Sequence, residues 1–414
     1  MMPERRPPPT GRRAPADTPS PADPSADSPD RSAELAALIR AEIESSPDRR
    51  ITFARYMELA LYEPDLGYYR ATADRPTDAG DFLTAPETHP IFGWTVARRV
   101  EAMWEELGRP PVFRLTEFGA GSGTLGLSIL DGLRRRGSTD LLAALRYEPI
   151  ESNPNRLADV RDRFEKAGHL ECLEPTGSPE IGSVPVDGVI LANEFLDALP
   201  VHRVVVKGGQ LRELFVAWNA GSGDADGPDR GGFIELAARP STADLAARLA
   251  DDGVELGEGQ VAEICLGLEP WLGQVAGRLA RGFVLVIDYG YEASELYGPR
   301  RLAGTLLGYR GHRVETDPFA SPGRIDLTAH VDFTAVTRLA ARRGFRTVSL
   351  TTQSEFLVAA GLEEELRALQ ASPDLTLADY TRARSGIVRM LDPRHMGRFR
   401  VLILAWGRGP SQPD

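Results

Sequence analysis

The segment 113–126 constrains the fold of this chain more than any other stretch. It opens with an apolar run that carries Glu117 near its end, and three alternating glycines follow at once: Gly119, Gly121 and Gly123. Helical periodicity then begins. Glycine lets a backbone turn tightly and approach a ligand closely, and the start of a helix presents unpaired N–H groups at a positive dipole end. The segment therefore predicts a strand, a loop and a helix that form a nucleotide-type site at the carboxyl end of a parallel strand.

Strands and helices alternate along the rest of the chain, which predicts an α/β fold with a doubly wound sheet. The run Val-Leu-Val-Ile at 284–287 is typical of a strand that is covered on both faces. Apolar runs and helical periodicity predict the elements in this order: helices at 53–62 and 92–107, a strand at 113–118, a helix at 124–136, a strand at 146–151, a helix at 155–167, strands at 188–192 and 283–288, helices at 333–343 and 355–370, and an antiparallel strand at 399–406.

Composition and pattern divide the chain into three parts. Residues 1–31 are rich in Pro, Ala, Asp and Ser and have little to bury, so we predict a disordered tail there. A helical region with a lid is expected over 32–110, and the α/β domain over 111–409. The long interval between the last two parallel strands predicts an insertion at about 203–281.

Charge and cysteine content exclude several classes of protein. The 414 residues carry a formal net charge of −12, which argues against general binding to nucleic acid or to an anionic membrane surface. The cysteines Cys172 and Cys265 lie far apart, so we expect neither a disulfide scaffold nor a zinc–thiolate site, and we expect a cytoplasmic location. The six histidines are scattered, so no metal site is expected. No apolar run approaches the roughly 18 residues that insertion into a membrane requires.

The glycine loop has three possible interpretations. In two of them it binds a cofactor, and in the third it is a plain turn. The G-x-G-x-x-G spacing from Gly121 to Gly126 matches the dinucleotide fingerprint, and Glu148 and Glu151 follow at about the spacing of the acid that contacts the ribose. In the other interpretation Glu117 precedes the glycines, which is typical of class I S-adenosylmethionine methyltransferases. Glu117 would then meet the positive methionine portion of the cofactor, and Glu151 would accept both ribose hydroxyls. This stretch alone leaves all three interpretations open.

Further segments, in order along the chain, resemble the MidA-like family of class I S-adenosylmethionine methyltransferases, the group of the mitochondrial complex I assembly methyltransferase. The most distinctive is ANEFLDALPV at 192–201. The others lie at 51–69 (ITF, ending in GYY), 80–93 (GDFLTAPE, ending in FG), 288–291 (DYGY), 304–312 (GTL, ending in H) and 326–333 (DLTAHVDF). The chain departs from the family at Ala120 and Ser122, where the glycine motif usually holds Pro and Arg.

The resemblance implies a Rossmann-like class I methyltransferase fold, S-adenosyl-L-methionine as cofactor, and a protein substrate. Because mitochondrial members methylate an arginine of a respiratory complex I subunit, protein arginine methylation in complex I assembly is the favoured expectation. A methyltransferase for small molecules or other residues is an alternative, and so is a non-catalytic assembly scaffold of the same fold. The residues that match the cofactor positions are Glu117, Gly119, Gly121, Gly123, Glu151 and Ser152.

The motif at 192–201 places polar side chains at the end of a strand, where open α/β sheets bind ligands. Arginine has a pKa of about 12.5, so its full deprotonation at pH 7 would cost about 7.5 kcal/mol. We therefore expect late proton transfer to a carboxylate already bonded to the guanidinium. Glu194 would clamp and deprotonate the group, Asn193 would orient it, and Asp197 is a second candidate carboxylate. Other residues in the family-like segments are expected to contact the substrate: Asp81, Phe82, Asp288, Tyr289, His312 and His330.

Overall fold

The computed structural model describes residues 29–70, 84–174, 184–221, 231–311, 313–373 and 375–407. The tail predicted at 1–31 lies almost entirely outside these ranges. Helix α1 (Pro29–Ser45) begins just before the predicted start of the helical region. The domain limits inferred from composition stay a prediction.

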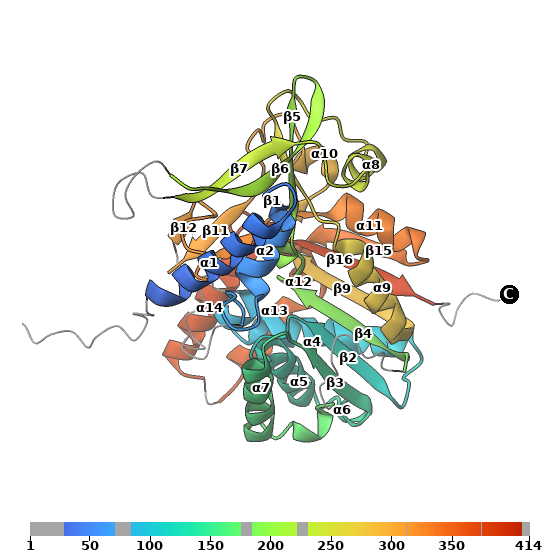
Figure 1. The fold of residues 1–414 in the computed structure, drawn as a ribbon. Coiled ribbons are helices and arrows are strands. Elements are labelled where there is room, and N and C mark those ends of the chain that lie inside the picture. Colours follow the sequence, from blue (N-terminus) through green and yellow to red (C-terminus); the bar gives the residue numbers. More distant parts are fainter. Residues whose placement is uncertain are drawn as a thin grey trace, which may run out of the picture.

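A six-stranded sheet forms the centre of the molecule and confirms the α/β prediction (Figure 1). Strands β2, β3, β4 and β9 run parallel, and β16 runs antiparallel to both of its neighbours. The carboxyl ends of the four parallel strands therefore meet at one edge of the sheet. From edge to edge, the strand order is β15 (Arg346–Thr352), β16 (Arg400–Trp406), β9 (Leu279–Asp288), β4 (Val186–Asn193), β2 (Phe113–Phe118) and β3 (Leu145–Ile150).

Helices cover both faces of this sheet. Alternate side chains of β9 point to opposite faces: Leu285 and Ile287 join one core, and Val284 and Val286 join the other. Both faces are apolar, which is why the strand reads as an uninterrupted apolar run in the sequence. The first core includes helices α4 (Ile91–Glu106), α5 (Thr124–Arg136), α7 (Pro154–Lys166), α12 (Gln353–Ala359) and α13 (Leu362–Gln370), and the second includes α9 (Leu268–Arg278) and α11 (Phe333–Arg342).

A second sheet lies between β4 and β9 in the sequence and beside the central sheet in space (Figure 1). The N-terminal region joins it, because β1 pairs with β6 and the side chains of Leu35, Tyr56 and Val216 share one core. This arrangement brings helix α2 to the carboxyl edge of the central sheet. The elements of this region are β1 (Arg50–Thr52), α2 (Phe53–Tyr62), β5 (His202–Lys207), β6 (Gln210–Asn219), β7 (Gly232–Ala238), α8 (Asp244–Asp251) and β8 (Val261–Ile264).

The structure contains more elements than the sequence predicted, among them strands β5 to β8 of the insertion. The helix predicted at 355–370 is two helices, α12 and α13, because Gly361 between them has a φ of 95° and interrupts the helical backbone. Helices α3 (Ala85–Thr88) and α14 (Leu377–Leu391) were not predicted. The remaining elements are α6 (Thr139–Ala144), η1 (Leu170–Cys172), η2 (Leu196–Ala198), β10 (Gly290–Tyr291), α10 (Ala293–Leu296), β11 (Leu307–Arg310), β12 (Arg313–Glu315), β13 (Asp326–Thr328), β14 (Val331–Asp332) and η3 (Met396–Arg398).

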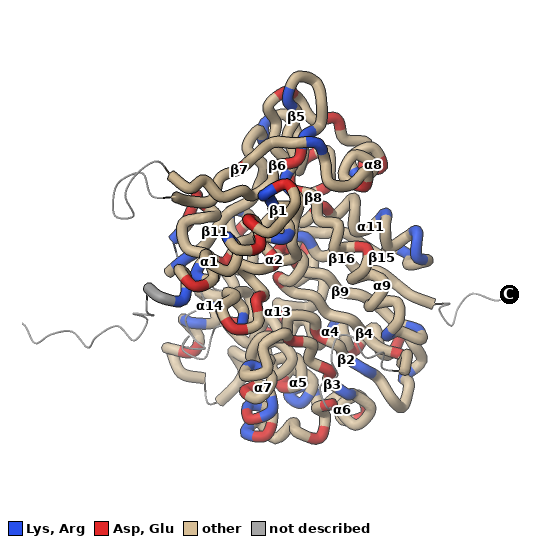
Figure 2. Tube along the Cα trace, viewed as in Figure 1, with Lys and Arg blue, Asp and Glu red and all other residues tan. Residues whose placement is uncertain are grey.

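Charged residues lie mainly on the outer helices and loops, whereas the central strands carry few of them (Figure 2). Across the described part of the chain, none of the helices has the length and apolar character that crossing a membrane would require.

Candidate functional site

A cavity of about 780 Å³ opens at the carboxyl ends of β2, β3 and β4. The glycine loop forms one side of it, and α2, α9 and β13 contribute other parts of the lining. An excess of acidic groups in such a lining favours a cationic ligand. Among the described lining residues, Arg156 is the one guanidinium, against seven carboxyl groups: Glu87, Glu117, Glu151, Asp159, Glu194, Asp197 and Asp326.

The glycine loop joins β2 to α5 through backbone conformations that suit glycine. Gly119, Gly121 and Gly123 have φ values of 69°, 54° and 73°, in the left-handed region. A side chain at Gly119 would also place its Cβ 2.9 Å from the ring of Phe195. Gly119 and Gly121 line the cavity, whereas Gly123 occupies the N-cap of α5. The glycines thus form the turn, and two of them leave space for a ligand.

Glu117 lies near the end of β2, beside the glycine loop, and only 4% of it is exposed. The hydroxyl of Tyr147 donates to its Oε2 at 2.8 Å. Burial raises the pKa of Glu117 to about 8, so the carboxyl group is largely protonated near pH 7 when no cation is close. A positive charge in the cavity would stabilise the ionised form. Glu117 therefore suits a ligand that carries a cation to this strand end.

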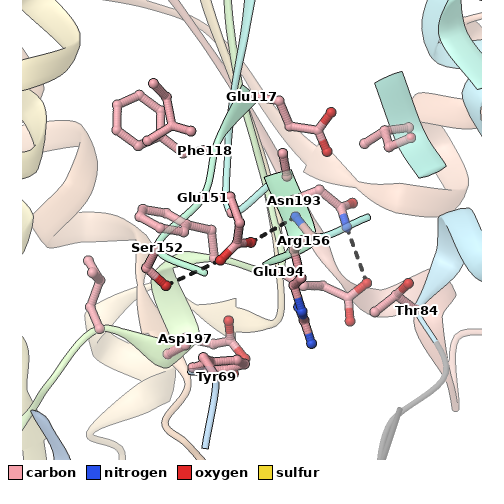
Figure 3. A pocket seen from close by; sticks show the side chains of 18 of the residues that line it. Tyr69, Thr84, Glu117, Phe118, Glu151, Ser152, Arg156, Asn193, Glu194 and Asp197 are labelled. Atoms are coloured by element: carbon pink, nitrogen blue, oxygen red, sulfur yellow. Dashed lines mark hydrogen bonds between the residues drawn. The ribbon is translucent and has the colours of Figure 1, made fainter. Parts of the chain in front are cut away.

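Glu151 follows β3 and connects it to the glycine loop (Figure 3). Its Oε2 accepts a hydrogen bond from the Gly121 N–H at 2.9 Å. Its Oε1 accepts from the Asn153 N–H at 2.9 Å and from the Ser152 hydroxyl at 3.2 Å. A carboxylate offers about four lone-pair positions, so Glu151 can still accept from a diol. Ser152 also lines the cavity.

Aromatic rings form a further part of the lining. The ring centroids of Phe118 and Phe195 lie 5.6 Å apart, and those of Phe195 and Trp271 lie 6.2 Å apart. With the two glutamates, these rings fit S-adenosyl-L-methionine. The rings would pack on its base, Glu151 would accept from its ribose, and Glu117 would face its cationic methionine end.

Glu194 adopts a strained conformation just beyond the end of β4. Its φ of 48° lies in a region that residues with side chains rarely adopt, and its N–H donates to the Ile287 carbonyl at 2.8 Å. Its Oε1 accepts from the Asn193 amide at 3.3 Å and from the Ala85 N–H at 3.4 Å (Figure 3). Burial, and then the nearby Asp197, raises the pKa of Glu194 to about 8. Strained backbone of this kind clusters at functional sites.

Two buried oxygens beside Glu194 have no hydrogen-bond partner among the described residues. They are Oδ1 of Asn193 and Oδ1 of Asp197. Asp197 lies on η2 with 5% of its surface exposed, and its Oδ2 accepts from the Tyr289 hydroxyl. Burial raises the pKa of Asp197 to about 7. Because an unpaired buried acceptor is unfavourable, both oxygens favour a ligand that donates hydrogen bonds.

Asp288 was expected to contact the substrate, but the structure places it behind the cavity. It is fully buried at the end of β9 and does not line the cavity. Its Oδ2 accepts from the N–H groups of Phe195 at 3.1 Å, Leu196 at 2.9 Å and Asp197 at 3.4 Å. Burial, and then the neighbouring Asp197, raises the pKa of Asp288 well above its usual range. The residue therefore positions the turn that carries Asp197.

The other residues expected to contact the substrate have different outcomes. Tyr289 lines the cavity, but His330 does not. The His330 ring packs on Tyr289 and Tyr291 with centroids 5.4 and 5.5 Å away, and burial lowers its pKa to about 4. The geometry therefore supports packing, not substrate contact, for His330. Three further residues lie outside the described ranges: Asp81, Phe82 and His312.

Sequence reasoning missed several residues of this cavity. Tyr62, Tyr69 and Asp326 line it and stand inside segments that resemble the MidA-like family, so their position was a usable signal. Trp271 comes from the insertion and had no such signal. Within the described ranges there is no group of three His, Cys, Asp or Glu residues placed to hold a metal ion.

Comparisons with known proteins point to one family. A family model described as a putative S-adenosyl-L-methionine-dependent methyltransferase matches residues 95–351. The chain is 29% identical to the mitochondrial protein arginine methyltransferase NDUFAF7 homolog of Drosophila melanogaster, over 89% of this chain and 84% of that protein. It is 27% identical to human mitochondrial NDUFAF7, over 86% of this chain and 80% of the human protein. A COG1565 superfamily structure from Burkholderia thailandensis, bound to S-adenosyl-homocysteine, is 32% identical to this chain. The two structures superpose with a TM-score of 0.79, over 91% of this chain and 92% of the other.

These relatives correct one expectation. The NDUFAF7 proteins of fly, zebrafish and human are named as mitochondrial, so the prediction of a cytoplasmic location is wrong. A low cysteine content indicates reducing surroundings, and that alone does not single out the cytoplasm.

Proposed function

Because this chain belongs to the family of S-adenosyl-L-methionine-dependent methyltransferases, we propose that it transfers the cofactor's methyl group to an arginine side chain of a protein. The observation that carries this proposal is the acidic end of the cavity at Asn193, Glu194 and Asp197. There, one buried oxygen of Asn193 and one of Asp197 have no hydrogen-bond partner among the described residues. A guanidinium brings five N–H donors and a positive charge, which are what those oxygens lack. The NDUFAF7 relatives are themselves named protein arginine methyltransferases.

The cofactor would occupy the side of the cavity formed by the glycine loop. Glu151 and Ser152 would hold its ribose, Gly119 and Gly121 would let its chain pass close to the backbone, and Glu117 would face its positive end. When bound, the cofactor supplies a methyl group on a cationic sulfur. Positioning and electrostatics then remain as the tasks of the protein.

The acceptor would be held on the opposite side, at the end of β4. Glu194 would accept hydrogen bonds from the guanidinium and receive the proton that the attacking nitrogen loses. Asn193 would accept an N–H through Oδ1 and fix the plane of the group. Burial raises the pKa of Glu194 to about 8, and pairing with a guanidinium would bring this pKa down. The proton therefore moves late, as the positive charge on the nitrogen grows.

The finer proposal is that the substrate is a subunit of respiratory complex I and that methylation serves assembly. It rests on the family-like segments, above all ANEFLDALPV at 192–201, which this chain shares with the group of the complex I assembly methyltransferase.

The test compares complex I subunits from cells with the gene, without it, and with Glu194→Gln in its place. We expect mass spectrometry to find one arginine that loses its methyl group in both altered strains. Glu105→Gln, an exposed change on α4, serves as the matched control and should leave the mark in place. An unchanged arginine mass in the deletion strain would remove complex I as the substrate. Normal assembly with Glu194→Gln would favour the scaffold alternative.

A further inference from the structure

One wall of the cavity consists of tyrosines that surround two aspartates. We call it the tyrosine–aspartate wall. Asp197 comes from η2 after β4, and Asp326 begins β13, so residues far apart in the chain meet here. Asp197 and Tyr69 lie together below Glu194 (Figure 3). The members of the wall are Tyr62, Tyr69, Asp197, Tyr289, Tyr309 and Asp326.

Hydrogen bonds to protein atoms hold the tyrosine rings in place. The Tyr69 hydroxyl donates to Asp326 Oδ1 at 2.6 Å, and the Tyr289 hydroxyl donates to Asp197 Oδ2. The Tyr62 hydroxyl donates to the Ala198 carbonyl at 2.9 Å. The rings of Tyr62 and Tyr69 lie 5.5 Å apart, tilted by 30°. Since these three hydroxyl protons are already used, the wall offers a ligand ring faces and carboxylate oxygens.

Asp197 supplies the independent sign of a ligand. Its Oδ1 is buried, lacks a hydrogen-bond partner among the described residues, and belongs to a residue that lines the cavity with 5% of its surface exposed. A buried carboxylate oxygen without a hydrogen-bond partner is unfavourable unless a ligand donates a hydrogen bond to it. The neighbouring Asp326 adds its negative charge to that of Asp197, so a cationic donor suits the unpaired oxygen best.

The shape of the wall distinguishes among cations. Flat aromatic faces stabilise the planar guanidinium by stacking, and paired carboxylates match its fork of N–H donors. An ammonium is compact and strongly hydrated and gains less from such a site. A neutral urea group has the same shape as a guanidinium but lacks the charge.

We propose that the tyrosine–aspartate wall holds the acceptor arginine as a charged guanidinium, with Asp197 and Asp326 on its N–H edges and tyrosine rings on its faces. This inference rests on the proposed function and extends it. Asp326, Tyr62 and Tyr69 become specificity-determining residues. Tyr62 ends helix α2, Tyr69 lies in the turn after it, and Asp326 begins β13. The side of the cavity formed by the glycine loop binds the cofactor, and the tyrosine–aspartate wall on the other side selects arginine.

The experiment measures binding of three small probes to the protein saturated with S-adenosyl-homocysteine: the N-acetyl amides of arginine, lysine and citrulline. Calorimetry or ligand-detected NMR gives each dissociation constant. We expect the arginine probe to bind more tightly than the lysine probe and the citrulline probe not to bind measurably. Asp326→Asn should weaken arginine binding about tenfold, the effect of losing one charge-assisted hydrogen bond, and should leave the affinity for S-adenosyl-homocysteine unchanged.

Asp162→Asn is the matched control, because it removes one exposed carboxylate from helix α7, outside the cavity. It should leave arginine binding intact. Equal arginine affinity in Asp326→Asn and the natural protein would overturn the inference, as would absence of arginine binding to the natural protein. Loss of affinity for S-adenosyl-homocysteine in Asp326→Asn would instead assign the wall to the cofactor's ammonium group. If the wall fails in these ways while the methylarginine mark in cells still depends on the gene, the proposed function stands.

Discussion

Two buried carboxyl groups of the cavity, Glu117 and Glu194, behave differently from carboxyl groups at the surface. Burial raises the pKa of Glu117 and of Glu194 to about 8, while no basic residue other than Arg156 lines the described cavity. These groups hold protons until a cation replaces them. The cavity is thus set up to exchange protons for a positively charged ligand, and the exchange can be measured.

The affinity for S-adenosyl-L-methionine is expected to rise as pH increases from 6 to 8. Binding lowers the raised pKa of Glu117, so the complex holds fewer protons than the free protein, and higher pH favours the complex. Calorimetry in two buffers with different ionisation enthalpies would show proton release. S-adenosyl-homocysteine, whose sulfur is neutral, is the control and should respond less. An affinity for S-adenosyl-L-methionine that is constant or falls over this range would contradict the assignment of Glu117.

Glu194→Gln is expected to lower the rate of methyl transfer about 100-fold or more, because glutamine can accept a hydrogen bond but cannot take up the proton. The affinity for S-adenosyl-homocysteine should not change. Transfer of labelled methyl groups to the proposed substrate, complex I from a deletion strain, gives the rate, with Glu105→Gln as control. A rate within about threefold of the natural protein would exclude Glu194 as the proton acceptor, since a lost general base costs far more.

At the scale of elements, the strand–loop–helix unit at the start of the α/β domain carries the cofactor side of the site. The strand at 113–118 and the helix at 124–136 occur with the predicted limits. The apolar residues Phe113, Leu115 and Phe118 mark the strand, and helical spacing followed by Gly137 marks the helix and its end. For the insertion, only its position at about 203–281 was predicted, and none of its strands. Its strands β5 to β8 were missed because half-buried alternation in short segments is a weak signal.

Gly119→Ala is expected to abolish measurable cofactor binding and to lower the free energy of unfolding by about 1–2 kcal/mol, because a Cβ at a φ of 69° is strained and would meet Phe195 at 2.9 Å. Gly137→Ala is the matched control. Its φ of 73° carries the same backbone strain, but nothing lies within 4 Å of the new Cβ. It should lose similar stability and bind the cofactor normally. Equal cofactor affinity in both variants would show that the close approach at Gly119 is not needed.

The whole molecule explains why the acceptor side of the cavity was harder to predict than the cofactor side. The glycine loop is one continuous segment, whereas Tyr62, Tyr69 and Asp326 lie far apart in the sequence and meet only after α2 and β13 pack together in one core. Asp288 and His330 stand in family-like segments but position or pack against other residues. The family-like segments therefore indicated which parts of the chain lie near the site. The packed structure was needed to tell the residues that line the cavity from those that support them.

The free protein is expected to be less stable at pH 8 than at pH 6. Glu117 and Glu194 keep protons in the native state up to a pKa of about 8, and Asp197 up to about 7, while the unfolded chain releases them near pH 4. The native state therefore binds more protons, and stability falls as pH rises through these values. Thermal unfolding at both pH values would show it, and Glu117→Gln should reduce the difference. A higher Tm at pH 8 than at pH 6 without ligand would be inconsistent with neutral cavity carboxyls.

The most direct test of the central claim is a crystal structure of this protein with S-adenosyl-homocysteine. The account predicts that both ribose hydroxyls bond to Glu151, that the methionine end lies near Glu117, and that the space between Glu194 and the tyrosine–aspartate wall stays open. A ligand bound elsewhere, or one whose ribose makes no contact with Glu151, would contradict it.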